Sequence, residues 1–308
     1  MAVWNSPAIC VYDWSEWKQF LIVSIWPKAR RICAEFHENP QKIAARLPSK
    51  TKLLLMHLDL SVMSPFISDP QEFTDAFSKR NVRVLNCLPL DIRKRTIQSH
   101  CRDFGLPSVT ASVTGPDDEL LLVKTDLNSG GNREQWLSPD QKVQFNLAPN
   151  GTRMTGPDDY FVGRRASLSP DIWNDPALVV ERYVKNPLHR FFRVYVAINA
   201  IVISEAYTDA IVKRMAGPIR RNNHFLSRHG DRICGDSNAS DKLPPRLLET
   251  AGSFLHRLHL DYGAIDVVES ETGEFYIVDL NKTPHWGDEK QPGMIEHLRS
   301  GFSKAMQD

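Results

Sequence analysis

The 308-residue sequence predicts an α+β protein of two or three domains. Short apolar runs alternate with amphipathic stretches over residues 1–88, which is typical of a small α/β domain. The remainder, 89–308, reads differently, because a clear helix signal is followed by strand-like runs with Gly, Pro, Asp and Asn clusters between them. We expect it to contain a loop-rich, mainly β lid at about 107–184 and a C-terminal subdomain at about 185–308.

Composition excludes several classes of protein. Lys and Arg number 38 against 37 acidic residues, so a net charge of +1 argues against nucleic acid as a partner. Five scattered cysteines without metal-ligand spacing indicate reduced thiols. No apolar run is long enough to span a bilayer, and the first residues lack the basic head of a signal peptide. We therefore expect a soluble, cytoplasmic protein without a membrane partner. The N-terminal tryptophans fit a core or a homodimer contact.

The expected elements before the lid begin with a buried strand at 52–57, a helix at 73–79 and a strand at 82–85. A helix then follows Asp91, which can cap it, and Gly105 ends it. In the lid we expect strands at 107–113, 120–125, 143–147, 160–162 and 178–183, separated by turn-forming clusters at 148–152 and 155–159.

The last third is expected to open with two antiparallel strands over 193–203, joined by a turn at 199–200. A polar linker at 231–244 leads to a helix that begins at Pro245. A terminal helix carries an apolar stripe at Met294, Ile295, Leu298 and Phe302.

The segment 262–284 predicts a β-hairpin with a turn at 271–274, and its acidic residues are its most informative feature. Asp266 then faces Asp279 across the strands, and Ile277, Asp279 and Asn281 share one face. Two carboxylates about 5 Å apart repel one another, so a cation is expected between them. With the amide oxygen of Asn281 they suit Mg²⁺ that is shared with phosphates. The alternative is a solvated hairpin with acidic residues by chance.

Three further features fit a phosphate-rich ligand. Lys124 ends an apolar strand just before the pair Gly130-Gly131, whose loop amides can hold phosphate oxygens. Lys94 lies in the first turn of the helix after Asp91, where an anion is favoured. The strand 179–184 is suited to meet a nucleotide base. Taken singly, each feature also fits an ordinary solvated lysine or turn.

The order of these features resembles the ATP-grasp superfamily, and in particular the carboxylate–amine ligases of the glutamate-adding and D-alanine–D-alanine ligase type. The resemblance covers residues 85–290, and the leading domain is similar to the pre-ATP-grasp domain. It implies an ATP-grasp fold with ATP and one or two Mg²⁺ ions as cofactors. The implied roles are phosphate binding by Lys94, Lys124, Gly130 and Gly131, base binding by Glu181 and Val184, ribose contact by His189, metal binding by Asp266, Asp279 and Asn281, and phosphate or substrate contact by Arg193, Arg214, Arg221 and Asn223.

Two positions depart from the family pattern. Members usually carry glutamate where this chain has Asp279, so two bridged Mg²⁺ ions are less expected than one. The stretch before the arginine strand, 189–192, lacks the acid that usually meets the ribose. The last three candidate residues lie in a basic stretch, 213–224, which is expected to be a loop that meets either an anionic substrate or only solvent.

The resemblance implies an ATP-dependent ligase that forms a C–N bond. A small-molecule or peptide carboxylate would attack ATP to give an acyl phosphate, and an amine would then displace phosphate. The alternatives are an ATP-grasp kinase that phosphorylates a hydroxyl and a catalytically silent nucleotide-binding protein.

Overall fold

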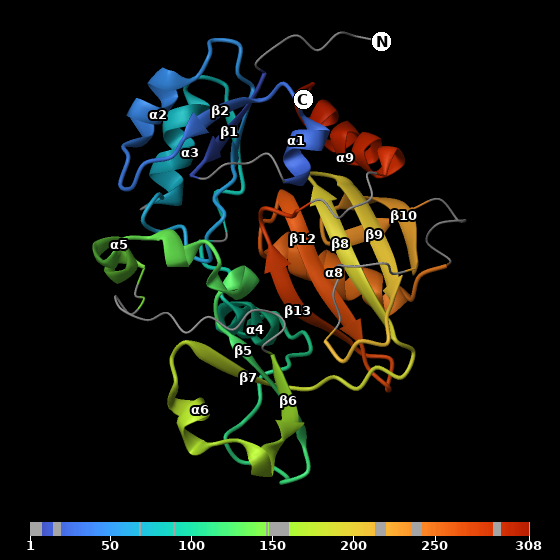
Figure 1. The fold of residues 1–308 in the computed structure, drawn as a ribbon. Coiled ribbons are helices and arrows are strands. Elements are labelled where there is room, and N and C mark those ends of the chain that lie inside the picture. The colour runs from blue at the N-terminus through green and yellow to red at the C-terminus, as the bar shows by residue number, and fades with distance from the viewer. Residues whose placement is uncertain are drawn as a thin grey trace.

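A computed structural model describes residues 8–14, 20–67, 69–88, 90–145, 147, 160–212, 220–235, 242–285 and 291–307. Three sheets organise this part of the chain (Figure 1). A four-stranded sheet forms the N-terminal layer, a three-stranded sheet forms a separate small layer, and a six-stranded sheet forms the C-terminal half. The α4 helix lies where the small sheet approaches the C-terminal one (Figure 1).

The N-terminal sheet is parallel, in the order β2-β1-β3-β4. Its central strands are buried on both faces, which explains their continuous apolar sequences. The predicted strands at 52–57 and 82–85 and the helix at 73–79 are confirmed. The elements are β1 (Ile9–Asp13), α1 (Leu21–Ile25), β2 (Arg30–Cys33), α2 (Pro40–Arg46), β3 (Leu53–Met56), α3 (Pro70–Ser78) and β4 (Arg83–Leu85).

The small sheet is antiparallel, in the order β6-β5-β7. It confirms the strands predicted at 120–125, 160–162 and 178–183. Its elements are β5 (Leu120–Thr125), η1 (Asn128–Gly131), η2 (Glu134–Trp136), α5 (Pro139–Gln144), β6 (Phe161–Arg164), η4 (Arg165–Ser167), α6 (Pro170–Asn174) and β7 (Leu178–Arg182).

Two strands predicted in this region are wrong. Residues 107–113 contain only an isolated bridge between Thr110 and Glu181. Residues 143–147 begin within α5, because Ser138 and Gln141 form a capping box that starts a helix there. The turn-forming clusters at 148–152 and 155–159 lie outside the described residues.

The C-terminal sheet is antiparallel, in the order β11-β10-β9-β8-β12-β13. Helices α4 and α8 pack on one face, while α9 packs on the other beside α1 (Figure 1). The strand pair over 193–203 and both C-terminal helices are confirmed. The elements are α4 (Lys94–Asp103), β8 (Arg190–Ala197), β9 (Ala200–Tyr207), β10 (Arg220–His229), β11 (Arg232–Cys234), α8 (Pro245–Arg257), β12 (Tyr262–Glu269), β13 (Phe275–Asn281) and α9 (Pro292–Ala305).

Two segments predicted as irregular form strands instead. The polar stretch 231–244 contains β11, which pairs with β10. The basic stretch 213–224 is part of β10 from Arg220 onward, where it pairs with β9. Neighbouring polar side chains of β10 point to opposite faces of the sheet, so that His224 contacts Glu205 on one face and Asn223 contacts Ser204 on the other.

The start of α4 also differs from the prediction. Its N-cap residue is Arg93. The Asp91 carboxylate accepts a hydrogen bond from the Arg93 backbone N–H at 2.9 Å and does not bond to the N–H groups of the first helical turn. The free N–H groups of Lys94 and Arg95 are satisfied by Asp126, through its carbonyl and its carboxylate, both at 2.8 Å. Because Asp126 follows β5, the cap fixes the helix to the strand that carries Lys124.

The N-terminal sheet shares a hydrophobic core with the C-terminal sheet. Val11 and Leu55 of the first pack in one cluster with Tyr195 and Tyr262 of the second, and α9 supplies Phe302. A second cluster lies between the C-terminal sheet and helices α4 and α8. The proposed boundary at residue 88 therefore separates two sheets that are packed against each other.

Gly301 lies where the backbone of α9 comes very close to the C-terminal sheet. A Cβ atom there would lie 2.0 Å from the carbonyl oxygen of Ala197. We expect Gly301→Ala to lower the free energy of unfolding by ~1–3 kcal/mol, because the helix must move off the sheet. Gly293→Ala, in the same helix, is the matched control, since its nearest contact would be 3.6 Å away. Denaturant unfolding measures both, and equal stabilities would contradict this packing.

A charged network covers the edge of the sheet face that packs on α8. The Glu205 carboxylate accepts hydrogen bonds from the Tyr207 hydroxyl at 2.7 Å and from Arg190 at 3.3 Å, with His224 at 3.4 Å. Arg190 also forms an ion pair with Glu269 at 2.5 Å. Burial raises the pKa of Glu205, but these donors outweigh it, so the pKa lies below the usual 4.5.

Glu205→Gln is therefore expected to reduce stability by about 1.5–3 kcal/mol at neutral pH. Because folding lowers the pKa of this group, its contribution is present above pH 4.5 and is lost as the pH falls through the folded-state pKa. The difference from wild type should thus shrink in acid, as measured by chemical denaturation across pH. The exposed Glu249→Gln is the control, and a constant difference at all pH values would refute the assignment.

Candidate functional site

The acidic hairpin forms as predicted at its central pair, where Asp266 faces Asp279. The register then shifts by one residue, since Val267 pairs with Ile277 and leaves Val278 as the extra residue of a β-bulge. The prediction that Ile277 shares the face of Asp279 is therefore wrong. Ile277 lies in the core on the α8 side, whereas Val278 and Asp279 line a cleft.

A row of polar residues crosses the sheet from this pair. Asp279, Asp266, Arg193, Ser204 and Asn223 occupy successive paired positions on β13, β12, β8, β9 and β10. The Arg193 guanidinium donates two hydrogen bonds of 2.6 Å to the Asp266 carboxylate. Burial alone would lower the pKa of Arg193, but the charge of Asp266 raises it by more than burial lowers it. The guanidinium group therefore stays charged. At the far end, the Ser204 hydroxyl donates to the amide oxygen of Asn223 at 2.6 Å.

The second carboxylate of the pair is held by Lys94. The ammonium group forms an ion pair with Asp279, and only 2% of the lysine is exposed. Burial raises the pKa of Asp279, but the charges of Lys94, Lys124 and Arg193 hold it below its usual value. Each hairpin carboxylate therefore already faces a cation from another element, Asp266 the guanidinium of Arg193 and Asp279 the ammonium group of Lys94.

Lys124 reaches the same cleft from β5. Its ammonium group lies 2.8 Å from the Glu181 carboxylate and donates to the Val278 carbonyl at 3.1 Å. Burial raises the pKa of Glu181, while the neighbouring ammonium opposes it. For Lys124, burial lowers the pKa and the Glu181 carboxylate raises it above the usual 10.5. The lysine is thus a buried cation whose partners come from β7 and from the bulge.

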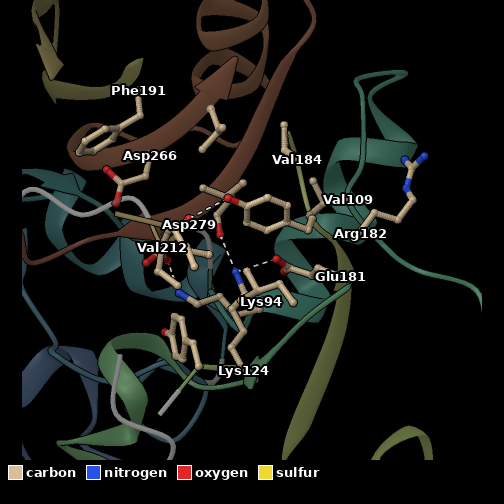
Figure 2. A pocket seen from close by; sticks show the side chains of 16 residues that line it. Lys94, Val109, Lys124, Glu181, Arg182, Val184, Phe191, Val212, Asp266 and Asp279 are labelled. Carbon is tan, nitrogen blue, oxygen red and sulfur yellow. Dashed lines mark hydrogen bonds and ion pairs between the residues drawn. The ribbon is translucent and has the colours of Figure 1, made fainter. Parts of the chain in front are cut away.

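These groups line a cleft between the small sheet and the C-terminal sheet, with about 760 Å³ of space including its open mouth. Figure 2 shows the two lysines, Glu181, Asp266 and Asp279 pointing into it, with Val184 and Phe191 on its walls. A mainly apolar cavity with a few converging charges is typical of a small-molecule site. The cleft is also lined by residues that are not among the candidates from the sequence, namely Val109, Leu122, Tyr160, Arg182, Tyr183, Phe191, Ile211, Val212, Val268 and Val278.

Not every candidate residue lines the cleft. His189 lies outside its lining, half-exposed, with Asp209 at 3.3 Å. Arg221 and Asn223 lie on β10 and not on a loop, and Asn223 donates to Gln291 ahead of α9. Arg214 lies outside the described residues.

The glycine loop is sharply bent, and its Gly130 and Gly131 are buried while Ser129 is exposed. Ser129, Gly130 and Gly131 all have positive φ angles, at 49°, 70° and 74°. Gly130 and Gly131 are not among the lining residues of the cleft, and η1 instead packs beside β13. A left-handed backbone of this kind explains the glycine pair, because larger residues rarely adopt it.

The hairpin residues fit a hard divalent cation. Asp266 and Asp279 offer carboxylate oxygens and Asn281 an amide oxygen, the donor set that Mg²⁺ uses together with phosphate and water. Among the described residues, no three acidic, histidine or cysteine side chains are placed to hold a metal ion together. Binding would require Lys94 and Arg193 to give up part of their present contacts.

No protein-family model and no curated protein sequence matches the chain. Solved structures do match. The ATP-grasp ligase PsnB, complexed with precursor peptide PsnA2 and AMPPNP, aligns with a TM-score of 0.54 at 11% identity, over 98% of this chain and 99% of that one. PsnB with a phosphomimetic precursor variant, Mg and ADP gives a TM-score of 0.52 at 10% identity, over 98% and 99%. The chain has the ATP-grasp fold.

The ATP-grasp fold accounts for the arrangement of all three sheets, and the predicted α+β class with a leading α/β layer is confirmed. Its small sheet carries Lys124 and Glu181, and its C-terminal sheet carries the acidic hairpin. Helix α4 supplies Lys94 at their junction. No helix in the described ranges is long and apolar enough to cross a membrane.

Proposed function

We propose that the protein is an ATP-dependent carboxylate–amine ligase that works through an acyl phosphate and releases ADP and phosphate. The observation that carries the proposal is the cleft in which Lys94 and Lys124 converge on Asp266 and Asp279. The two buried ammonium groups would bind a polyphosphate, and the two carboxylates beside them would bind its divalent cation. The PsnB complexes, which contain AMPPNP or Mg and ADP, support this interpretation.

ATP is expected to enter with its base against the apolar walls near Val184 and Phe191. The backbone of the strand after Glu181 would meet the base edge, and the two lysines would meet the phosphates. Asp266, Asp279 and Asn281 would hold Mg²⁺, which supplies charge neutralisation for the phosphate oxygens when bound.

In the first step, a carboxylate oxygen attacks the γ-phosphorus and ADP leaves, which gives the acyl phosphate. In the second step, an amine attacks the acyl carbon, and phosphate departs with the bonding electron pair while the amine loses a proton. Lys94 and Arg193 neutralise the charge that develops on the transferred group, and the cleft walls exclude water from the intermediate. Positioning and charge supply most of the rate enhancement.

The polar row suggests where the acceptor lies. Beyond Arg193 it continues through Ser204 to Asn223, on the sheet face that carries Asp266. Neutral hydrogen-bonding groups there suit an amide-rich or carboxylate substrate, either a small molecule or a peptide. The PsnB structures contain precursor peptides, which favours including peptides among the candidates.

Hydroxylamine trapping tests this reaction class. The enzyme is incubated with MgATP, hydroxylamine and pools of carboxylates, and each pool is scored for ADP and for a new hydroxamate by mass spectrometry. A hydroxamate that requires ATP supports the ligase. ADP formed together with a stable phosphoester, and without hydroxamate, would instead identify a kinase. If the protein binds MgATP but forms no ADP with any pool, it would instead be a catalytically silent nucleotide-binding protein.

A further inference from the structure

The amide of Asn281 is oriented by a neighbour that is itself buried. The Asn281 Oδ1 atom accepts a hydrogen bond from the Thr283 backbone N–H at 2.9 Å, with the Thr283 hydroxyl at 3.5 Å. An amide oxygen has two lone pairs, so this contact leaves one for a cation. Because only 1% of Thr283 is exposed, its side chain has little freedom to move.

Thr283 is held in turn by the N-terminal layer. Its hydroxyl donates to Asp59 Oδ1 at 2.8 Å, in a buried contact between residues 224 positions apart. The other carboxylate oxygen of Asp59 accepts from Arg133 Nε at 2.6 Å. Asp59 is 7% exposed and does not line the nucleotide cleft, so any effect on the reaction must pass through its partners.

Arg133, which Asp59 contacts, belongs to the segment 128–134 that contains the glycine loop. Ser61 forms hydrogen bonds with both ends of this segment. The Ser61 hydroxyl donates to Glu134 Oε1 at 2.6 Å and accepts from the Asn128 N–H at 2.8 Å. Burial raises the pKa of Glu134, although both Ser61 donors oppose it. Residues 59–61 therefore contact the start and the end of the loop that spans 128–134.

We propose that Asp59, acting through Thr283, is a positioning residue that sets the amide of Asn281 for Mg²⁺ and holds it in register with the glycine loop. The inference rests on the proposed function, since it concerns the same metal and phosphate site. One carboxylate from the N-terminal layer thus joins two parts of the site that come from different sheets. Loss of such outer contacts typically weakens metal binding by about 10–100-fold.

The hydroxyl of Thr283 can be removed with almost no change of shape. Thr283→Val deletes the donor, whereas Thr283→Ser keeps both the hydroxyl and the backbone contact. ATP-induced thermal shifts are recorded on the full chain while Mg²⁺ is titrated. We expect Thr283→Val and Asp59→Ala, which remove the donor and the acceptor of this bond, to raise the Mg²⁺ midpoint by about 10-fold or more, and Thr283→Ser to keep the wild-type midpoint. The nucleotide shift in EDTA and the ligand-free melting temperature separate this effect from general destabilisation.

Three results would overturn the inference. A wild-type Mg²⁺ midpoint in Thr283→Val would show that the hydroxyl does not position the ligand. An equal rise in Thr283→Ser would assign the effect to packing and not to the hydrogen bond. A fall in the EDTA shift as large as the fall with Mg²⁺ would assign it to nucleotide binding in general. If wild type itself shows no Mg²⁺-dependent response to ATP, the proposed function fails before any variant is compared.

Discussion

Asp279→Asn is expected to reduce ATP turnover by ~10²–10³-fold, with a matching loss of Mg²⁺-dependent ATP binding. The change removes one of two carboxylates available to the cation, at the position that faces Asp266. Asparagine keeps an oxygen that can accept from Lys94, so the buried ammonium is not left without an acceptor. ADP release and calorimetric titration with MgATP measure the two effects.

The control for this variant is Glu271→Gln, which removes a carboxylate from the exposed turn of the same hairpin. It should bind MgATP as wild type does. Undiminished MgATP binding by Asp279→Asn would remove the metal assignment, whereas a loss in both variants would point to damage of the hairpin.

Lys124→Met is expected to weaken ATP binding by ~10²-fold or more, because a buried charge-assisted contact to phosphate is lost. It also removes the cation beside Glu181, whose pKa burial already raises. The variant should therefore lose stability as the pH rises through the pKa of Glu181, since its charged form is no longer compensated.

Fluorescence titration with ATP and thermal melts from pH 5 to pH 9 measure both effects. Lys79→Met, on the exposed end of α3, provides the charge-matched control. ATP affinity equal to wild type in Lys124→Met would exclude this lysine from the phosphate site. A double variant, Lys124→Met with Glu181→Gln, should recover the stability at high pH but not the affinity.

The sequence predicts those parts of the site that depend on local pattern. Counting outward from a turn at 271–274 pairs Asp266 with Asp279, and the structure has that pair, although the strands beside the turn are offset by one residue and the bulge at Val278 restores the predicted register. Lys94 and Lys124 follow from their places at the start of a helix and the end of a strand. Each of these inferences uses contacts between residues close in sequence or across one hairpin.

The contacts that were not predicted join distant segments. The cap of α4 comes from Asp126, and the hydroxyl of Thr283 is held by Asp59, and neither aspartate has a periodic or motif signal in the sequence. The helix α5 is different, since its capping pair Ser138 and Gln141 is a signal close in sequence, whereas the apolar run at 143–147 on its own predicts a strand. The family resemblance implies a loop for Arg221 and Asn223, and the polar residues of this strand give no apolar alternation that would indicate β10 instead.

The bulge at Val278 makes β13 one residue longer than its partner requires. A hairpin without that residue would still close, and alternation would still direct Asp279 toward the cleft and Ile277 toward the core. What it would lose is the spare carbonyl that Lys124 engages at 3.1 Å. A single-codon deletion that leaves every acidic residue in place would therefore deprive a buried ammonium group of its backbone acceptor.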